Sequence, residues 1–355
     1  MSEYFSSSLL SLSPYTPGEQ PENLSRYIKL NTNENPYSLG DSTILEAVRS
    51  MRSLNLYPDP GQKELRRKLA GLYSVESENV TLSNGSDEML LFSFLAFCPQ
   101  KTRILTPDIT YSFYSTLTSL TGLGTVEIPL KDDFTVDVDA FCENAGTVVI
   151  ANPNALTGIA MDRESIEKIV KSRKDRIVII DEAYADFSDV TALPLIGRYP
   201  NIVVIRTFSK SRSLAGARLG YAIAPSPLIE DIERVRGSIN PYNINSFTLS
   251  AATLKLSDEE KTWENIRKIK ETRDWTGKEL GKLGFSVLPS NANFLFVSNP
   301  LLPGASYYEK LKEKGILIRH FDKTRISSWS RITIGRREEM EKLIKTTEEL
   351  INERI

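Results

Sequence analysis

Short, uninterrupted apolar runs are the feature of this sequence that most restricts its fold. The runs at 147–151 (Thr-Val-Val-Ile-Ala) and 177–180 (Ile-Val-Ile-Ile) hold no charged residue. Strands of this composition are buried on both faces, as in parallel sheets. Similar runs alternate with segments of helical periodicity, which favours an α/β fold with a mostly parallel sheet. The pattern predicts strands at 80–83, 103–106, 125–128, 147–151, 176–181, 202–206 and 219–223.

The helical segments and a later change of pattern indicate more than one domain. Periodicity predicts helices at 43–54, 61–73, 86–97, 111–118 and 162–172. From about residue 257 a long charged helix is expected over 258–283, with its charges on a solvated face. Short strands (294–297, 316–318, 331–334) and helices (306–314 and from 336) follow it. We expect a large domain at 43–256, a smaller α+β domain at 257–355, and an N-terminal segment, 1–42, that joins the smaller domain.

Composition excludes several kinds of chemistry. Among 355 residues there is a single histidine, His320, so histidine-clustered metal sites are excluded and no metal is expected. A Ser-His-Asp scheme would have to use His320, which we interpret as a packing or surface residue. Cys98 and Cys142 show neither a disulfide framework nor metal-ligand spacing. Chemistry must therefore come from Lys, Asp, Tyr and Arg side chains, or from a bound cofactor.

Charge and hydropathy limit the partners and the location of the protein. The net charge of −2 provides no bulk attraction to nucleic acid or to an anionic membrane. The longest apolar stretch, 89–97, is far shorter than the roughly 20 residues that span a bilayer. The Ser-rich start has its first basic residue at Arg26, unlike a secretory signal. We expect a cytoplasmic protein with no nucleic-acid or membrane partner.

Polar residues follow four of the predicted strands, where an open parallel sheet binds its ligands. Residues 84–88 (Asn-Gly-Ser-Asp-Glu) begin a helix, and their backbone N–H groups could meet a phosphate. The alternative is an ordinary helix cap by Ser86 or Asp87. Residues 152–158 (Asn-Pro-Asn-Ala-Leu-Thr-Gly) form a tight connection whose two asparagines could also present amide donors.

The other two segments carry an acid and an amine. Asp181 follows an apolar run, so its carboxylate needs a partner, which could be a ligand or a structural salt bridge. Lys210, within 207–212 (Thr-Phe-Ser-Lys-Ser-Arg), could be a nucleophilic amine or belong to a basic surface loop. All four segments stand at predicted carboxyl ends of strands, which indicates one shared ligand site.

These residues resemble those of the fold-type I aminotransferases, which use pyridoxal 5'-phosphate (PLP), and most closely the histidinol-phosphate aminotransferases. The most specific element is Ser209-Lys210 followed eight residues later by Arg218, with Gly220 beyond it. Asp181-Glu182-Ala183-Tyr184 and the Asn-Pro-Asn turn also match. The similarity extends from residues 30–37 to residues 331–335. It implies a seven-stranded, mostly parallel sheet in a large domain, and a smaller α+β domain.

The resemblance assigns catalytic and cofactor-binding roles. Lys210 looks like the amine that attaches covalently to PLP, and Asp181 like the acid that pairs with the pyridine nitrogen. Asn154 and Tyr184 match the pair that hydrogen-bonds the phenolic oxygen of the ring. Tyr111 matches the aromatic residue that stacks on the ring. The residues at phosphate-holding positions are Gly85, Ser86, Asp87, Ser209 and Arg218. Leu156 departs from the family, because it stands where a proline is expected.

The resemblance also implies substrate contacts and a partner subunit. Tyr57 resembles the tyrosine that reaches the cofactor phosphate of a neighbouring subunit, so a homodimer is expected. Arg331 matches the arginine that binds the substrate's carboxylate or phosphate, and Arg319 resembles its helper. Asn33 and Tyr37, from the matching N-terminal stretch, complete the expected substrate-binding residues. The substrates would be a small amino donor and a keto acid.

The function implied is amino transfer between histidinol phosphate and 2-oxoglutarate, in histidine biosynthesis. Threonine-phosphate decarboxylases and aromatic amino-acid aminotransferases share most of these motifs and remain alternatives. A nicotinamide dehydrogenase is disfavoured because Gly122-Leu123-Gly124 precedes a predicted strand and lacks a third glycine. A PLP-binding DNA regulator would need a basic recognition helix that is absent here. Neither Gly277-Lys278 nor Gly281-Lys282 is followed by Ser or Thr, as a phosphate-binding P-loop requires.

Overall fold

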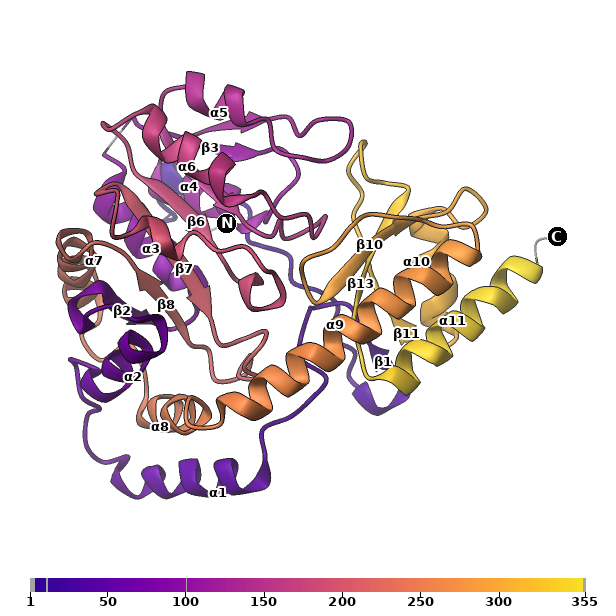
Figure 1. Cartoon of the computed structure of the whole chain (residues 1–355), viewed down its shortest axis with the longest axis horizontal. Helices are drawn as coiled ribbons and strands as arrows, with labels where there is room; N and C mark the ends of the chain where they lie inside the picture. Colours follow the sequence, from indigo (N-terminus) through magenta and orange to yellow (C-terminus); the bar gives the residue numbers. More distant parts are fainter. Residues whose placement is uncertain (1–3, 11, 100, 354–355) are drawn as a thin grey trace.

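The computed structural model describes residues 4–10, 12–99 and 101–353. Figure 1 shows a large body built on one twisted sheet and a smaller body beside it, joined by the long helix α9 (Glu259–Lys282). No helix within the described ranges is both long and apolar enough to cross a membrane.

The large sheet has seven strands, and six of them run in the same direction. β8 alone is antiparallel to its neighbours, β2 and β7. In sheet order the strands are β2 (Val80–Ser83), β8 (Gly220–Ile223), β7 (Ile202–Thr207), β6 (Val178–Asp181), β5 (Thr147–Ala151), β3 (Arg103–Pro107) and β4 (Gly124–Ile128). The prediction of a mostly parallel seven-stranded sheet is confirmed.

The central strands are buried on both faces, which explains their continuous apolar sequences. Val149 and Ile179 pack into the cluster that includes α3 and α4, while Ile150 and Ile180 face α5 and α6. The alternation follows from the two-residue repeat of a strand. The helices around this sheet are α1 (Asp41–Arg49), α2 (Lys63–Tyr73), α3 (Ser86–Phe97), α4 (Phe113–Thr121), α5 (Val138–Glu143), α6 (Arg163–Ser172), α7 (Ser226–Ile239) and α8 (Ser246–Lys255).

Several predicted elements differ from the structure in their bounds, among them the helix expected at 111–118, which is α4 (Phe113–Thr121). The expected helix at 43–54 is α1 followed by a 3₁₀ turn, Ser50–Ser53. The strand expected from residue 176 begins at Val178, and the Arg176 side chain donates hydrogen bonds to carbonyls near the end of α5. Arg176 Nη1 donates to Asn144 O at 2.7 Å, and Arg176 Nη2 donates to Phe141 O at 2.8 Å.

The smaller body is an antiparallel sheet with helices. Its strand order is β12 (Arg319–His320), β13 (Trp329–Thr333), β10 (Phe294–Ser298) and β9 (Ser286–Val287), with α10 (Gly304–Glu313) and α11 (Arg337–Asn352) beside them. In addition, β1 (Ile28–Lys29) pairs in parallel with β11 (Ile316–Leu317). The N-terminal segment therefore lies against this body.

Helix α9 is not only a solvated face. Ile266, Ile269 and Leu280 are buried in the core, and polar residues such as Thr272 and Thr276 are enclosed beside them. The charged side is solvated as expected, but the helix is more than a solvated face, because its other side is buried in the core. Most charged residues lie on the outer side, with Arg273 as a buried exception, and the apolar positions recur at helical spacing on the inner side.

Candidate active site

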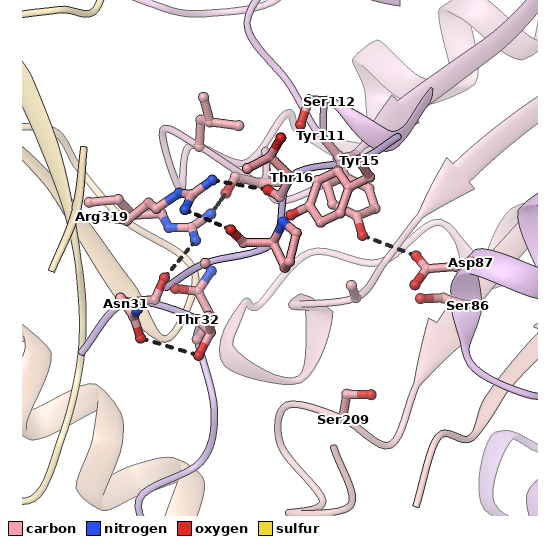
Figure 2. Close-up of a pocket in the computed structure, with 18 of the residues that line it drawn as sticks. Tyr15, Thr16, Asn31, Thr32, Ser86, Asp87, Tyr111, Ser112, Ser209 and Arg319 are labelled. Atoms are coloured by element: carbon pink, nitrogen blue, oxygen red, sulfur yellow. Dashed lines mark hydrogen bonds between the residues drawn. The ribbon is translucent and has the colours of Figure 1, made fainter. Parts of the chain in front are cut away.

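A cavity of about 1060 Å³ lies at the carboxyl ends of β5, β6 and β7, against the smaller body. Its wall includes residues from both bodies and from the N-terminal segment (Figure 2). The predicted site residues that line it are Asn33, Ser86, Asp87, Tyr111, Asp181, Tyr184, Ser209, Lys210, Arg218, Arg319 and Arg331. Gly85, Asn154, Tyr37 and Tyr57 are not among its lining residues.

Asp181 ends β6 and is buried beneath this cavity. Its Oδ2 accepts a 2.8 Å hydrogen bond from the Tyr114 hydroxyl, and its Oδ1 accepts one of 3.2 Å from Ala183 N–H. Burial raises the pKa of Asp181 to about 6, although both hydrogen bonds act in the opposite direction. Among the described residues no lysine or arginine forms an ion pair with Asp181. The site thus holds an acid whose charge lacks a cation.

Lys210 follows β7 and points its amine into the same cavity. Lys210 Nζ donates to Thr32 O at 3.3 Å and lies 5.8 Å from the centre of the Tyr184 ring. The amine is half-buried and makes no ion pair within the described part of the chain. It is therefore placed to meet a ligand that also contacts Tyr184.

Tyr184 is held by residues distant in sequence. Its hydroxyl accepts a 2.9 Å hydrogen bond from Asn33 Nδ2, and Asn33 Oδ1 accepts one of 3.0 Å from the Thr333 hydroxyl. Asn33 adopts a left-handed backbone conformation with φ of 56°, which asparagine tolerates better than most residues. This chain of bonds joins the N-terminal segment, the large sheet and β13 at one point.

Asn154 lies behind the cavity wall. Its Nδ2 donates to Ile109 O at 2.9 Å, and its Oδ1 accepts from Leu156 N–H at 2.9 Å and Thr157 N–H at 3.1 Å. Its neighbours Ala155 and Leu156 line the cavity instead. The turn is closed by these bonds with Leu156 in the position where the family pattern has proline.

The N-terminus of α3 forms a narrow cradle that excludes larger side chains. A Cβ at Gly85, where φ is 89°, would come within 2.6 Å of the Arg218 guanidinium, and one at Gly220 would collide with Ser86 N. Asp87 accepts from Arg218 at 3.2 Å. It also accepts from the Tyr111 hydroxyl at 3.1 Å (Figure 2). Backbone N–H groups at a helix start together with an arginine suit an anion such as phosphate.

Arg331 carries a positive charge that meets no acid. Its guanidinium donates to Ala155 O at 3.0 Å and Asn31 O at 3.2 Å, and its enclosed Nε lacks a partner. Phe294 and Phe321 flank it, with ring centres 5.3 and 5.4 Å away. Burial lowers the pKa of Arg331. None of the ion pairs between described residues includes it, so this arginine is available to an anion in the cavity.

The remaining predicted residues lie as follows. Arg319 donates to Pro17 O at 3.1 Å and Thr16 O at 3.2 Å, so it holds the N-terminal segment at the cavity rim (Figure 2). Tyr37 packs against Lys268 and Arg336, outside the cavity wall. Tyr57 is 80% exposed and stacks on Tyr242, with ring centres 4.4 Å apart.

Sequence reasoning missed two tyrosines at this site. Tyr15 lines the cavity, and its ring meets that of Tyr111 edge-on at 5.8 Å. It lies in a Ser/Pro-rich stretch with no pattern that marks a site. Tyr114 contacts Asp181, and its signal was a spacing of three residues from Tyr111 within the helix predicted at 111–118, although α4 begins only at Phe113.

The chain is similar to known proteins over nearly its whole length. Residues 25–346 match the family model described as aminotransferase class I and II. The histidinol-phosphate aminotransferase of Brachyspira hyodysenteriae is 42% identical over 353 residues, covering 99% of both chains. That of Clostridium beijerinckii is 44% identical over 347 residues, covering 97% of this chain and 96% of the relative.

A solved structure extends this likeness to three dimensions. The histidinol-phosphate aminotransferase of Sinorhizobium meliloti, solved in complex with pyridoxal-5'-phosphate, superposes with a TM-score of 0.88 at 25% identity and covers 99% of each chain. These likenesses define the class of protein as a fold-type I enzyme that works with PLP. The chain belongs to the aminotransferase class I and II family. It is therefore a transaminase.

Proposed function

We propose that this enzyme transfers the amino group of histidinol phosphate to 2-oxoglutarate, with PLP as its cofactor. One observation carries the proposal. Asp181 is an acid without a cation and Arg331 is a cation without an acid, and both line one cavity. Bound cofactor and substrate would compensate both charges, because the cofactor presents a protonated ring nitrogen to Asp181 and the substrate presents an anionic group to Arg331.

Residues of this chain fit each part of the cofactor. The cradle formed by Gly85, Ser86, Ser209 and Arg218 would hold the phosphate, with Asp87 balancing the arginine. Tyr111 would cover one face of the ring, and Tyr184 would lie on the side of its phenolic oxygen. Asn154, expected beside Tyr184 there, would instead shape the wall from behind through the turn that carries Ala155 and Leu156. Bound PLP supplies an electron sink for the bonds at the amine-bearing carbon.

The protein's contribution is to position groups and to move one proton. Asp181 would keep a proton on the ring nitrogen, because its buried carboxylate has no other cation. Lys210 Nζ would attach the cofactor and then carry the proton that leaves the amine-bearing carbon, as general base and then acid. Arg331, assisted by Arg319, would fix the substrate's anionic group, with Asn33 on the same side. Tyr37, expected with them, lies outside the cavity wall.

The relatives' names support histidinol phosphate as the amino donor. The test is to add histidinol phosphate and then 2-oxoglutarate to purified, PLP-loaded protein and to follow its visible absorbance. We expect the lysine-bound band to bleach with the donor and to return with the keto acid. Lys210→Ala should show neither band nor turnover, while the surface variant Lys270→Ala should behave as wild type. Carbon dioxide release without a keto-acid requirement, or a response to aromatic amino acids alone, would overturn this assignment in favour of a decarboxylase or an aromatic aminotransferase.

We further propose that the enzyme is a homodimer in which Tyr57 reaches the partner's cofactor phosphate. The support is an exposed apolar surface on α1, the turn after it and the following loop. Figure 1 shows α1 at the edge of the large body, away from its sheet. Leu45, Leu54, Leu56 and Tyr57 are 67, 58, 65 and 80% exposed. Light scattering should give twice the 39.9 kDa mass of the chain.

Domain limits and location are proposals of the same kind. We propose a large domain at 43–256, a smaller domain at 257–355 and an N-terminal segment, 1–42, that belongs with the smaller one, as the pairing of β1 with β11 supports. Two unpaired thiols, Cys98 and Cys142, support a reducing, cytoplasmic location. Cell fractionation would test the location, and limited proteolysis would test the limits.

A further inference from the structure

A cluster of buried charges lies directly behind the segments that carry Asp181 and Lys210. Arg206, in β7, donates through Nε and Nη2 to Glu182 Oε2 at 2.9 and 2.6 Å, and through Nη1 to Asp186 Oδ1 at 3.0 Å. The exposed fractions of these three side chains are 7, 0 and 12%. Glu182 also accepts from Ala192 N–H at 2.5 Å, so the loop after β6 is folded around Arg206.

Asp186 connects this cluster to the residue beside Lys210. Its Oδ2 accepts a 2.5 Å hydrogen bond from the Ser211 hydroxyl. Burial alone would raise the pKa of Asp186, but the charges of Arg212 and Arg206 outweigh it, so the pKa is lowered. Arg212 is in turn paired with Glu259 at the start of α9. Asp186 therefore stays ionised between two arginines and presents one oxygen to Ser211.

The main chain at Lys210 is also held from the opposite side. Asn35 Nδ2 donates to the carbonyls of Lys210 and Ser211, each at 3.0 Å. Rotation of the peptide between these residues would break one of the Asn35 bonds or the Ser211 bond. Among these contacts, only the bond to Asp186 ties the lysine segment to the loop that follows Asp181.

We propose that Asp186 is a positioning residue for amino transfer: through Ser211 Oγ it fixes the Lys210 segment relative to Asp181 and Tyr184. The inference rests on the proposed function. As general base and then general acid, the Lys210 amine takes a proton at one atom of the bound ligand and returns it at another. The main chain of Lys210 must therefore stay fixed while its side chain moves between these two atoms. A displacement of about 1 Å at a reacting group can lower a rate by up to about 100-fold.

Ser211→Ala is the primary test, because it removes one hydroxyl and leaves every charge of the cluster in place. Ser188→Ala is the matched control: Ser188 lies in the loop after β6, and its Oγ accepts from Val190 N–H at 3.1 Å, away from the Asp186–Ser211 bond. We expect Ser211→Ala to lower kcat about tenfold, with KM for histidinol phosphate changed less than about twofold. The unfolding temperatures of the two variants should agree within about 2 °C, and Ser188→Ala should keep the wild-type kcat.

A second arm asks whether Asp186 acts through Ser211. Asp186→Ala, which removes the accepting oxygen that an asparagine would keep, should also lower kcat. The double variant should be no slower than Asp186→Ala alone, because both changes remove the same bond. Additive losses, or a Ser211→Ala enzyme with wild-type kcat, would overturn the proposal and leave the cluster a purely structural feature.

A third measurement separates this inference from the proposed function. Hydrogen exchange of the peptide 207–214 in the cofactor-free chain should be faster in Ser211→Ala than in wild type or Ser188→Ala. If Ser211→Ala exchanges no faster than wild type while the wild-type enzyme traps PLP on Lys210, the anchor is refuted and the proposed function stands. If Ser211→Ala exchanges faster but the wild-type enzyme traps no PLP, the anchor is supported and the proposed function fails.

Discussion

Tyr114 donates a 2.8 Å hydrogen bond to Asp181 Oδ2, and both side chains are buried. Asp181 is the acid that would face the cofactor's ring nitrogen, so Tyr114 sets both its orientation and its ionisation. The bond lowers the pKa of Asp181 against the larger, raising effect of burial. Burial raises the pKa of Tyr114 well above its usual value, and the neighbouring Asp181 raises it further. The tyrosine therefore keeps its proton and remains a donor.

Replacement of Tyr114 by phenylalanine should therefore slow amino transfer without removing a charge. We expect kcat to fall about tenfold, the effect of losing a hydrogen bond to a charged group. The pKa of Asp181 should rise further. The control is Tyr307→Phe, which removes a buried hydroxyl bonded to Thr347 at 2.7 Å in the smaller body. Equal kcat values in the two variants would show that the Tyr114 hydroxyl does not act on Asp181.

The pKa of Asp181 also predicts a pH-dependent stability for the cofactor-free protein. Its pKa rises from 3.8 to about 6 on folding, so the folded chain binds more protons than the unfolded chain between these values. Stability must then fall as pH rises through this window, by about 3 kcal/mol for a shift of this size. Below the window the carboxyl is neutral in both states; above it, the buried charge destabilises the folded state.

Urea denaturation of the cofactor-free chain at several pH values measures this loss. Asp181→Asn should remove it, so that the variant is more stable than wild type at pH values above the window while its amino transfer is far slower. Asp189→Asn, which changes a 91% exposed acid, should keep the wild-type pH dependence. Parallel stability curves for wild type and Asp181→Asn would contradict the raised pKa.

Local sequence predicted the parts of this site that follow continuous strands. Run 147–151 is β5 itself, and Asp181 and Lys210 lie at carboxyl ends because each follows a buried apolar run. The periodicity of 43–54 did not show where α1 ends and a 3₁₀ turn begins. Nor did the charges of α9 reveal its buried side, since apolar positions there are sparse.

Contacts between distant segments could not be predicted from local patterns. Asn33 meets Thr333 across 300 residues of sequence, and this contact fixes Tyr184. Tyr15 comes from a stretch with no periodicity and becomes part of the cavity wall. Such contacts depend on how the two bodies pack against each other, and this packing cannot be predicted from the spacing of residues along the chain.

Arg331 should govern affinity more than turnover. Arg331→Gln removes the cation that would bind the substrate's anionic group, so KM for histidinol phosphate should rise about 10- to 100-fold, the range for a lost charge-assisted pair. The stability of the free enzyme should change little, because the lost charge had no acidic partner. Arg337→Gln, an exposed change on α11, is the control. An unchanged KM in Arg331→Gln would rule out the anion-binding role.

Subunit mixing tests whether Tyr57 completes a neighbouring site. Tyr57→Ala and Lys210→Ala homodimers should each be nearly inactive, since every cavity lacks either the tyrosine or the lysine. In a mixed dimer, the cavity of the Tyr57→Ala chain keeps its own Lys210 and receives Tyr57 from its partner. Random exchange in an equal mixture should therefore restore about a quarter of wild-type activity, because half of the dimers are mixed and each has one complete cavity. If Tyr57 served the cavity of its own chain, every cavity in the mixture would still lack one residue, and activity would stay at the level of the separate variants. A mixture of Lys210→Ala with Lys210→Ala/Tyr57→Ala, which contains no intact lysine, shows the background.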